Sequence, residues 1–546
     1  MLRNMLSQER GVAALLALLM IGMLLLIGLA ALSTSDDEVQ IAGNEWHETK
    51  AFYAAEAGLQ VAMSALQTEY DSTGVPPLVL PSGQVTLNGC VTNYGSSDNG
   101  PAVMRPLSSG SLAGLHALVK SFSVDASAVS QADNSRVDLA ESFEVALVPI
   151  FQFAVFYDND LEIAPGPMMT LTGRVHTNSN LYLQSNVNLQ MDSYISAAGE
   201  IHHGRKGPGG AGAGDVQIRD AAGNLVSMRM GGNWLDADYS NWYDSSLGRW
   251  NGRVKDQAHG QQRLNLPLSN SGNPHALIER AAGNPDSYEN KATLKLIDGV
   301  AWRKMENGSW QDVTGAMIAD GALAYRSDGF TDQREGAAVD VTELDVEKMY
   351  AGGYAPLNGV VYFSDEPTSS ADWPALRLVN GDVLDDGLTV ASENPLYTLG
   401  DFNSNNKKPA ALMADAITFL SNSWVDSLSN RNKAVRLARQ TTVNASYLTG
   451  NVETTASDYN GGFENLPRFL ETWTGVNFNW KGSAVNLWNS QQADGTWNGT
   501  YYSPPNRVWQ YDTDLNDPNK LPPETPMIRV FQRTGWTQRY VGYAGS

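Results

Sequence analysis

Four oxygen-bearing side chains near the C-terminus have the alternate spacing of a calcium-binding loop. They are Asp512, Asp514, Asn516 and Asp517, and calcium prefers carboxylate and amide oxygens as ligands. Asp517 stands where an EF-hand needs glycine, and Pro523 where it needs a bidentate glutamate. A turn rich in Asp and Asn accounts for the same residues. The sequence therefore leaves a turn and an irregular calcium site open, and it predicts no other cofactor.

Common signatures of hydrolases do not occur in this sequence. Neither Gly-x-Ser-x-Gly nor His-Glu-x-x-His is found. The single cysteine, Cys90, excludes an intrachain disulfide. Lys407, Lys408 and Arg507 could line a cleft for an acidic ligand, or could simply be solvated. We therefore predict a protein without enzymatic activity.

Tryptophan is concentrated in the later portion of the chain, with 13 of the 14 residues after position 230. An exposed tryptophan on a β scaffold offers a large flat surface to a sugar or a partner protein. Most of these side chains are expected in the core, and a binding face built from at least one of them stays open.

The composition is strongly acidic. The formal net charge is −22 and the isoelectric point is about 4.7. Nucleic acid is excluded as a partner, because phosphate binding needs clustered Lys and Arg. Such a charge suits a soluble, self-repelling surface outside the cell. Without disulfides, the exported region must be stable through its core alone.

An apolar segment near the N-terminus could cross a membrane. Val12–Leu32 holds 21 residues without charge or proline, and as a helix it is about 31 Å long, close to the roughly 30 Å hydrocarbon core of a bilayer. Arg3 and Arg10 precede it and acidic residues follow it, so the N-terminus stays in the cytoplasm and residues 36–546 are translocated. The residues that define this membrane helix are Val12, Leu16, Gly22, Gly28 and Leu32.

Three kinds of segment compete for this N-terminus. A cleaved secretory signal has a shorter apolar core and a small-x-small cleavage site, which is absent here. A plain signal anchor needs no cleavage. A prepilin-type leader is cut after a glycine that precedes the apolar run, and Gly11 followed by Val12 has that placement. We favour the prepilin-type leader, with Gly11 and Val12 as the processing site.

The helical pattern continues beyond the membrane segment. Apolar residues recur at steps of mostly three and four as far as Leu66, and no proline occurs between Met1 and Val75. A helix from Val12 to Gln67 would be about 84 Å long. That length exceeds any bilayer, so the outer half must pack on its own globular domain or on neighbouring subunits.

The segment after the membrane helix resembles the N-terminal module of PilX-type pilus-assembly proteins. The resemblance rests on two short motifs: Ala42, Gly43, Asn44, and then Ala51, Phe52, Tyr53, Ala54, Ala55, Glu56, Ala57. It implies membership of the type IV filament machinery. The implied partners are other pilins and minor pilins, the prepilin peptidase, the inner-membrane assembly platform and the membrane itself. The implied location is the inner membrane, single-pass with a periplasmic head, and then the pilus or cell surface.

One position departs from the pattern of major pilins. Major pilins carry a glutamate at the fifth residue after cleavage, and that position here is Leu16. A buried glutamate needs a cationic partner, whereas leucine needs none. The GspK-type pseudopilin of type II secretion and tip-proximal minor pilins are similar in this departure. It implies a subunit built for the end of a filament. Val12 in place of the usual phenylalanine leaves cleavage itself open.

Short strands dominate the rest of the chain. We predict an α+β fold, mainly β, in which a long N-terminal helix packs on a pilin-like sheet and a large β-rich head follows, as a β-solenoid or a closely wound sandwich. The expected divisions are a leader at 1–11, a transmembrane and stalk helix at 12–70, a pilin-like β region at 71–150, a first, solenoid-like segment of the head at 151–203, an inserted Trp-rich region at 204–355, and a second, β-rich segment of the head at 356–546.

These features predict a non-enzymatic minor pilin or pseudopilin that primes or caps a type IV filament at its tip. Small residues such as Gly22 and Gly28 would allow close packing between helices. A second hypothesis is a tip adhesin that contacts surface glycans or proteins through the β head. A third is a membrane-anchored β-solenoid carbohydrate-active enzyme, which would need paired carboxylates facing one groove.

Overall fold

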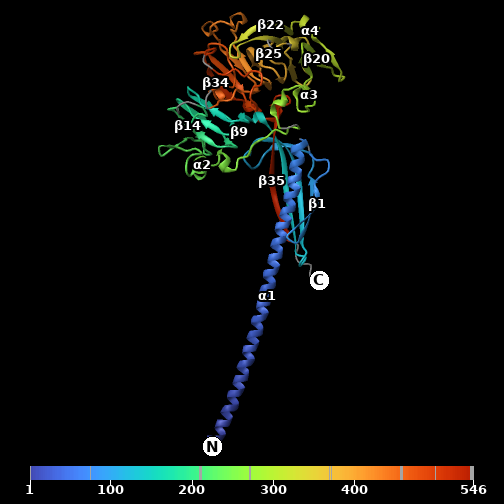
Figure 1. Ribbon diagram of the computed structural model, residues 1–546, viewed down its shortest axis with the longest axis vertical. Coiled ribbons are helices and arrows are strands. Elements are labelled where there is room, and N and C mark those ends of the chain that lie inside the picture. The colour runs from blue at the N-terminus through green and yellow to red at the C-terminus, as the bar shows by residue number, and fades with distance from the viewer. Residues whose placement is uncertain are drawn as a thin grey trace.

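The computed structural model describes residues 2–73, 76–207, 212–269, 272–367, 369, 372–455, 459–497 and 500–540. Met1, and the side chains of residues 2–10 in the predicted leader, lie outside the described residues. One long helix projects from a β-rich body, with the N-terminus at its free end (Figure 1). The predicted class, mainly β with a long N-terminal helix, is confirmed.

Helix α1 (Leu2–Thr73) is continuous over 72 residues, about 108 Å at the usual helical rise. Proline is absent from this stretch, and the internal Gly43 and Gly58 are each tolerated at a cost of about 1 kcal/mol relative to alanine. Residues 12–70, predicted as a transmembrane and stalk helix, are helical throughout, and the helix extends further at both ends. Only its last third contacts the body, beginning at Ala51.

The end of α1 lies on a six-stranded antiparallel sheet. The sheet order is β1-β2-β4-β5-β35, with β3 paired to β4. The strands are β1 (Ser82–Leu87), β2 (Cys90–Asp98), β3 (Val103–Pro106), β4 (His116–Ser130), β5 (Arg136–Pro149) and β35 (Met527–Tyr540). Strands β4 and β5 alternate buried and partly exposed residues, as expected for a sheet covered on one face. Helix and sheet share one apolar core that includes Leu59, Leu66, Phe122 and Phe143.

Strand β35 corrects the predicted division of the chain. Residues 356–546 were expected in the head, yet Met527–Tyr540 pairs with β5, for example Phe531 opposite Val145. The head is therefore inserted between two neighbouring strands of the helix-bearing sheet. The chain leaves the sheet at Pro149 and returns at Met527, and the backbone N–H of Ile150 donates to the carbonyl of Pro526 at 2.9 Å.

The N-terminal region of the head consists of three stacked coils. Each coil contributes one strand to each of three parallel ladders. The strands are β6 (Phe153–Tyr157), β7 (Leu161–Ile163), β8 (Met169–Leu171), β9 (Arg174–Thr177), β10 (Leu181–Leu183), β11 (Asn188–Met191), β12 (Ile195–Ala197), β13 (Ile201–His203) and β14 (Asp215–Arg219). Leucine, isoleucine and valine from successive coils stack in a common core.

The C-terminal region of the head adds parallel strands to the same core. Strand β33 pairs with β6 and extends one ladder into a twelve-stranded sheet, while an eight-stranded sheet lies beside it. The parallel strands are β24 (Val360–Ser364), β25 (Pro374–Val383), β26 (Leu388–Ser392), β27 (Leu396–Asn405), β28 (Ala410–Ala414), β29 (Ile417–Leu420), β30 (Thr441–Val443), β31 (Ser446–Thr449), β32 (Asn477–Gly482), β33 (Ala484–Asn486) and β34 (Asn506–Tyr511).

The solenoid prediction is not confirmed. Regular stacking is confined to the three coils, and the turns of the second series have unequal lengths of chain. No solenoid of constant period is found among the described residues of the head. Two parallel-strand regions of different regularity share one core instead.

Residues 204–355 do not form a separate insertion, contrary to the prediction. Strand β14 completes the third coil, β18 and β19–β21 belong to the twelve-stranded sheet, and β22 and β23 belong to the eight-stranded sheet. The remaining elements of this region are β15 (Leu225–Ser227), β16 (Arg229–Met230), β17 (Asn233–Trp234), α2 (Trp242–Trp250), β18 (Val254–Lys255), α3 (Tyr288–Lys291), β19 (Leu294–Ile297), β20 (Val300–Lys304), β21 (Trp310–Asp312), α4 (Thr314–Ala319), β22 (Leu323–Asp332), β23 (Ala337–Asp345) and α5 (Val346–Ala351).

Candidate functional site

The N-terminal two thirds of α1 carry large apolar side chains without protein around them. Val12, Leu16 and Leu32 are 58%, 55% and 67% exposed, and nothing lies within 4 Å of a side chain added at Gly22 or Gly28. The most apolar 18-residue window has a mean hydropathy of 2.9 and no buried residue. Such a helix is consistent with a membrane anchor. Gly11 and Val12 lie within the continuous helix, accessible from all sides.

The second of the two short motifs, Ala51–Ala57, lies where α1 meets the sheet. Ala51 and Ala55 are fully buried against it. The half-buried Phe52 ring lies edge-on to Trp536 of β35, at 6.1 Å between ring centroids. Glu56 is exposed and Ala57 is half-buried. The small side chains therefore let the helix backbone approach the sheet closely.

The first family motif lies outside this contact. Ala42 and Asn44 are exposed, and Gly43 is half-exposed with nothing within 4 Å. The structure thus places the two motifs in different surroundings along one helix. Among the described residues, only the second motif has a packing partner.

The end of α1 is held by the returning strand β35. The guanidinium of Arg529 donates to the carbonyl of Tyr70 and to the carboxylate of Asp71, which satisfies one of the carbonyls left open at a helix C-terminus. The Arg529 side chain is only 7% exposed. Beside it, a cavity of about 730 Å³ separates the helix end from the head.

The predicted calcium loop is paired with lysine side chains. The Lys407 ammonium contacts the carboxylate of Asp512 and lies 2.8 Å from that of Asp514. Lys520 contacts Asp514 at 3.0 Å, and these hydrogen bonds lower the pKa of Asp514 to about 2. A lysine ammonium therefore stands between the two carboxylates that would bind a cation.

The other two candidate ligands face different partners. The Asn516 side-chain oxygen accepts a hydrogen bond from the Tyr511 hydroxyl at 2.9 Å. Asp517 caps a short 3₁₀ helix by accepting from the backbone N–H of Asn519 at 3.0 Å. Across the described residues, no group of three or more His, Cys, Asp or Glu is arranged to hold a metal ion. The calcium site stays a prediction that this geometry does not support.

The three basic residues proposed for an acidic-ligand cleft are only partly brought together. Lys407 and Lys408 line one cavity. Arg507 lies elsewhere, donating to the carbonyl of Glu464 at 3.0 Å. Lys481 and Lys520, which sequence reasoning missed, complete the wall of the cavity. No local pattern links these lysines, because they come from separate turns of the head.

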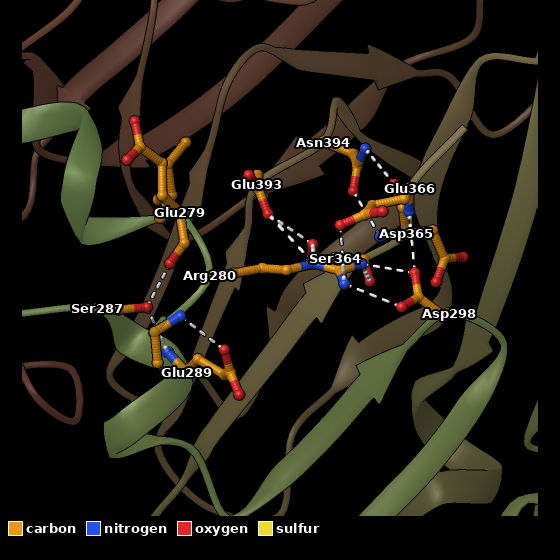
Figure 2. Close-up of polar contacts among 12 residues, drawn as sticks. Glu279, Arg280, Ser287, Glu289, Asp298, Ser364, Asp365, Glu366, Glu393 and Asn394 are labelled. Carbon is orange, nitrogen blue, oxygen red and sulfur yellow. Dashed lines mark hydrogen bonds and ion pairs between the residues drawn. The ribbon is translucent and has the colours of Figure 1, made fainter. Parts of the chain in front are cut away.

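A second polar cluster surrounds Arg280 (Figure 2). Its guanidinium contacts the carboxylate of Asp298 through both terminal nitrogens, one at 2.9 Å, and lies 3.2 Å from Glu366 and 3.9 Å from Glu393. Hydrogen bonding to Asp298 raises the pKa of Arg280. Ser364 links the group by accepting from Arg280 at 2.8 Å and donating to Glu393 at 2.6 Å. One guanidinium thus contacts three carboxylates and links the turns that carry them.

Two carboxylates of the head are both buried and close enough to interact. Burial raises the pKa of Glu464 to about 7, and the charge of Glu162 adds to the shift. Glu464 accepts a hydrogen bond from the backbone N–H of Ala164 at 2.8 Å, and Glu162 accepts one from the Tyr459 hydroxyl, also at 2.8 Å. Glu162 and Glu464 are only 4% and 5% exposed. The enzyme hypothesis requires paired carboxylates that face an open groove, whereas these two side chains are buried.

Most tryptophans of the head are buried or half-buried, but two on neighbouring strands are exposed. Trp302 of β20 and Trp310 of β21 are each 40% exposed. Trp302 pairs with Asp312, and Trp310 with Lys304. Directly paired residues share a face of a sheet, as do residues two apart, so both indole rings lie on one face. Strand β20 lies near the end of the head remote from the N-terminus (Figure 1).

Comparisons with known proteins return few matches. No protein-family model matches the chain, and no curated protein matches it. A solved structure described as the competence-associated pilin ComZ from Thermus thermophilus is similar at 13% identity, over 90% of this chain and 97% of that chain, with a TM-score of 0.23. At this TM-score the similarity supports neither a shared fold nor a shared function. What the chain itself shows is a long apolar N-terminal helix packed on an antiparallel sheet.

Proposed function

We propose that this protein is a non-enzymatic minor pilin or pseudopilin of a type IV filament machinery. Its helix α1 inserts in the inner membrane and then in the filament core, while the head faces the periplasm and later the cell surface. The observation that carries the proposal is the contrast along α1 between a bare apolar rod and a small-residue face buried on an antiparallel sheet.

The position proposed for the subunit is the filament tip. Leu16 stands where major pilins carry a glutamate, and a subunit without that carboxylate has less to gain from sitting beneath another subunit. The head also spans about 375 residues, from Ile150 to Pro526, which is hard to repeat along a tightly packed shaft. Other pilins, the prepilin peptidase and the assembly platform are the partners that this function requires.

Processing and location test the proposal together. In the strain that encodes the protein, we expect a mature N-terminus at Val12 by mass spectrometry and co-purification with sheared filaments. A Gly11→Leu variant should keep its membrane insertion, remain uncut and be absent from the filaments. An uncut wild-type chain confined to the membrane fraction would refute the proposal in favour of a plain signal anchor.

Immunogold labelling tests the position in the filament. Labels on the head should lie at filament ends, and deletion of the gene should reduce piliation. Labels repeated along the shaft would contradict the tip assignment while leaving the membership in the filament intact.

A second candidate function is a tip adhesin, and the pair Trp302 and Trp310 favours it. Both indole rings are partly exposed on one sheet face, with the Lys295 ammonium 4.8 Å from the centroid of the Trp310 ring. Exposed indole rings offer flat apolar surfaces on which sugar rings can stack. We expect the full-length protein to bind immobilised oligosaccharides, with loss of binding in Trp302→Ala and Trp310→Ala. Trp536→Ala is the matched control, because Trp536 is 49% exposed but belongs to the sheet under α1. Unchanged binding in the two head variants would refute the adhesin hypothesis.

A further inference from the structure

A basic pocket in the head is the feature whose chemistry is not accounted for by a filament role. The cavity measures about 300 Å³, and its wall includes Lys407, Lys408, Lys481, Lys520, Asp512 and Asp514. We name it the lysine pocket. The lining residues carry four ammonium groups and two carboxylates, so their summed charge is positive in a chain whose net charge is −22.

Ion pairs within the pocket do not neutralise all of the positive charge of its lining residues. Asp514 is contacted by Lys407 and Lys520, and Asp512 by Lys407 and, at 3.5 Å, by Lys481. Each carboxylate therefore already has two ammonium neighbours. The Lys408 ammonium makes no ion pair with a carboxylate among the residues that the structure describes. Among the lining residues two positive charges are in excess, although Asp517, outside the lining, also attracts Lys520. A bound anion would relieve the repulsion between the ammonium groups.

The pocket is built on rigid backbone. Its wall is formed by turns that precede β28 and β31, by the end of β32, and by the loop after β34. The buried Asn403 side chain joins two of these turns. It donates to the carbonyls of Lys408 and Asn444 at 2.7 Å each and accepts from the backbone N–H of Lys408 at 2.8 Å. The turn that carries Lys408 is thus held in place before any ligand arrives.

We propose that the lysine pocket binds one oxyanion group, a carboxylate, sulfate or phosphate, carried by a small polar molecule. Ammonium groups form charge-assisted hydrogen bonds with such oxygens. The volume is at the lower end of the range for small-molecule sites, which suits a group of monosaccharide size. Lys408 and Lys481 are the residues that contact the anion, and Lys407 and Lys520 hold the acidic wall in place. This binding does not depend on whether α1 enters a filament.

Isothermal titration of the full-length protein in detergent micelles tests the proposal. The probes are inorganic phosphate, sulfate and glucuronate, which separate the three kinds of oxyanion. We expect saturable binding of at least one probe at low ionic strength, and a weaker affinity as salt is added. Lys408→Gln should weaken that binding about tenfold, the loss expected for one charge-assisted contact.

Two variants distinguish a ligand site from a network of internal ion pairs. Lys348→Gln removes a positive charge from α5, whose lysine side chain is 52% exposed and lies outside the pocket, and it should bind the probe like the wild type. Asp514→Asn removes a competing carboxylate and should tighten binding. Absence of saturable binding for all three probes up to about 10 mM, or equal affinity in folded Lys408→Gln protein, would overturn the proposal.

Discussion

The two halves of helix α1 use apolar residues in opposite ways. From Val12 to Leu32 every residue is exposed and most side chains are large, whereas from Ala51 to Leu66 the buried face is made mostly of alanine, glycine and leucine. Lipid tails wrap around large side chains, but a flat sheet is approached closely only over small ones. One continuous helix thus has an exposed apolar half suited to lipid and a second half with one face packed on the sheet.

Leucine truncation should give the largest difference between the two halves. Leu59 is fully buried between helix and sheet, so Leu59→Ala should destabilise that module by about 2–5 kcal/mol. Leu19 is 56% exposed, and Leu19→Ala should leave the module unchanged. Hydrogen exchange of β4 and β5 amides in detergent measures both. Equal protection in the two variants would show that the helix contributes nothing to the sheet.

Glycine substitution should have opposite signs in the two halves. A Cβ at Gly58 would lie 2.6 Å from the Thr92 methyl group and 3.3 Å from Ala126 Cβ. Overpacking outweighs the gain in helix propensity, so Gly58→Ala should cost about 1–2 kcal/mol. Gly43 has nothing within 4 Å, and Gly43→Ala should stabilise the helix by up to about 1 kcal/mol. Hydrogen exchange during denaturant unfolding measures the free energy of unfolding of both variants. A stabilising effect of Gly58→Ala would contradict the close approach of helix and sheet at this position.

Removal of an acidic charge should matter only at the packed end of the helix. Asp71 pairs with the nearly buried Arg529, while its own side chain is 51% exposed. Asp71→Asn should therefore loosen the last turn of α1 by about 0.5–1 kcal/mol. The control is Asp37→Asn, in the exposed half, which should have no effect. Amide exchange of residues 66–72 measures the change, and an unaltered rate in Asp71→Asn would refute the tie.

The smallest expected effect concerns a pKa. Burial raises the pKa of Glu141 on β5, Arg533 lowers it, and Glu56 of α1 raises it. Because the folded pKa is above the unfolded one, the stability contributed by protonated Glu141 is present at low pH and is lost as the pH rises through the raised pKa. Glu56→Gln removes a repulsion and should reduce this loss, by less than about 0.5 kcal/mol.

The pH dependence of thermal unfolding provides the measurement. The melting temperature of Glu56→Gln should fall less with rising pH than that of the wild type. Glu48→Gln, in the region of α1 outside the sheet contact, should follow the wild-type profile. A steeper fall in Glu56→Gln would reverse the assigned sign of the interaction.

Local patterns predicted those elements whose residues are neighbours in the chain. The three- and four-residue spacing from Ile41 to Leu66 indicated the helix beyond the membrane, and short runs such as Arg174–Thr177 and Leu388–Ala391 indicated strands that the structure contains. Phe463, Leu466, Phe469 and Trp473 have the same spacing, which by itself indicates a short amphipathic helix, but the structure does not contain one. Only a 3₁₀ turn, Phe463–Asn465, forms there, because the apolar residues fill the head core from extended backbone.

The candidate sites could not be predicted to the same extent. Asp512 and Asp514 have the spacing of cation ligands, but their partner Lys407 lies about a hundred residues earlier in the chain. Arg280 likewise contacts acidic residues in the turns that follow β19, β24 and β26. Local spacing says which oxygens are near one another, and it says nothing about which ammonium or guanidinium group the fold brings to them.

The sequence by itself determined a helix of membrane length and the apolar stripe that continues beyond it, since each depends on residue types within a few turns. The tertiary structure alone decided that β35 closes the sheet under α1, that residues 204–355 join the head sheets and that lysines fill the acidic loop. Strand order and ion pairing depend on contacts between segments hundreds of residues apart, whose choice rests on the complete core rather than on any local pattern.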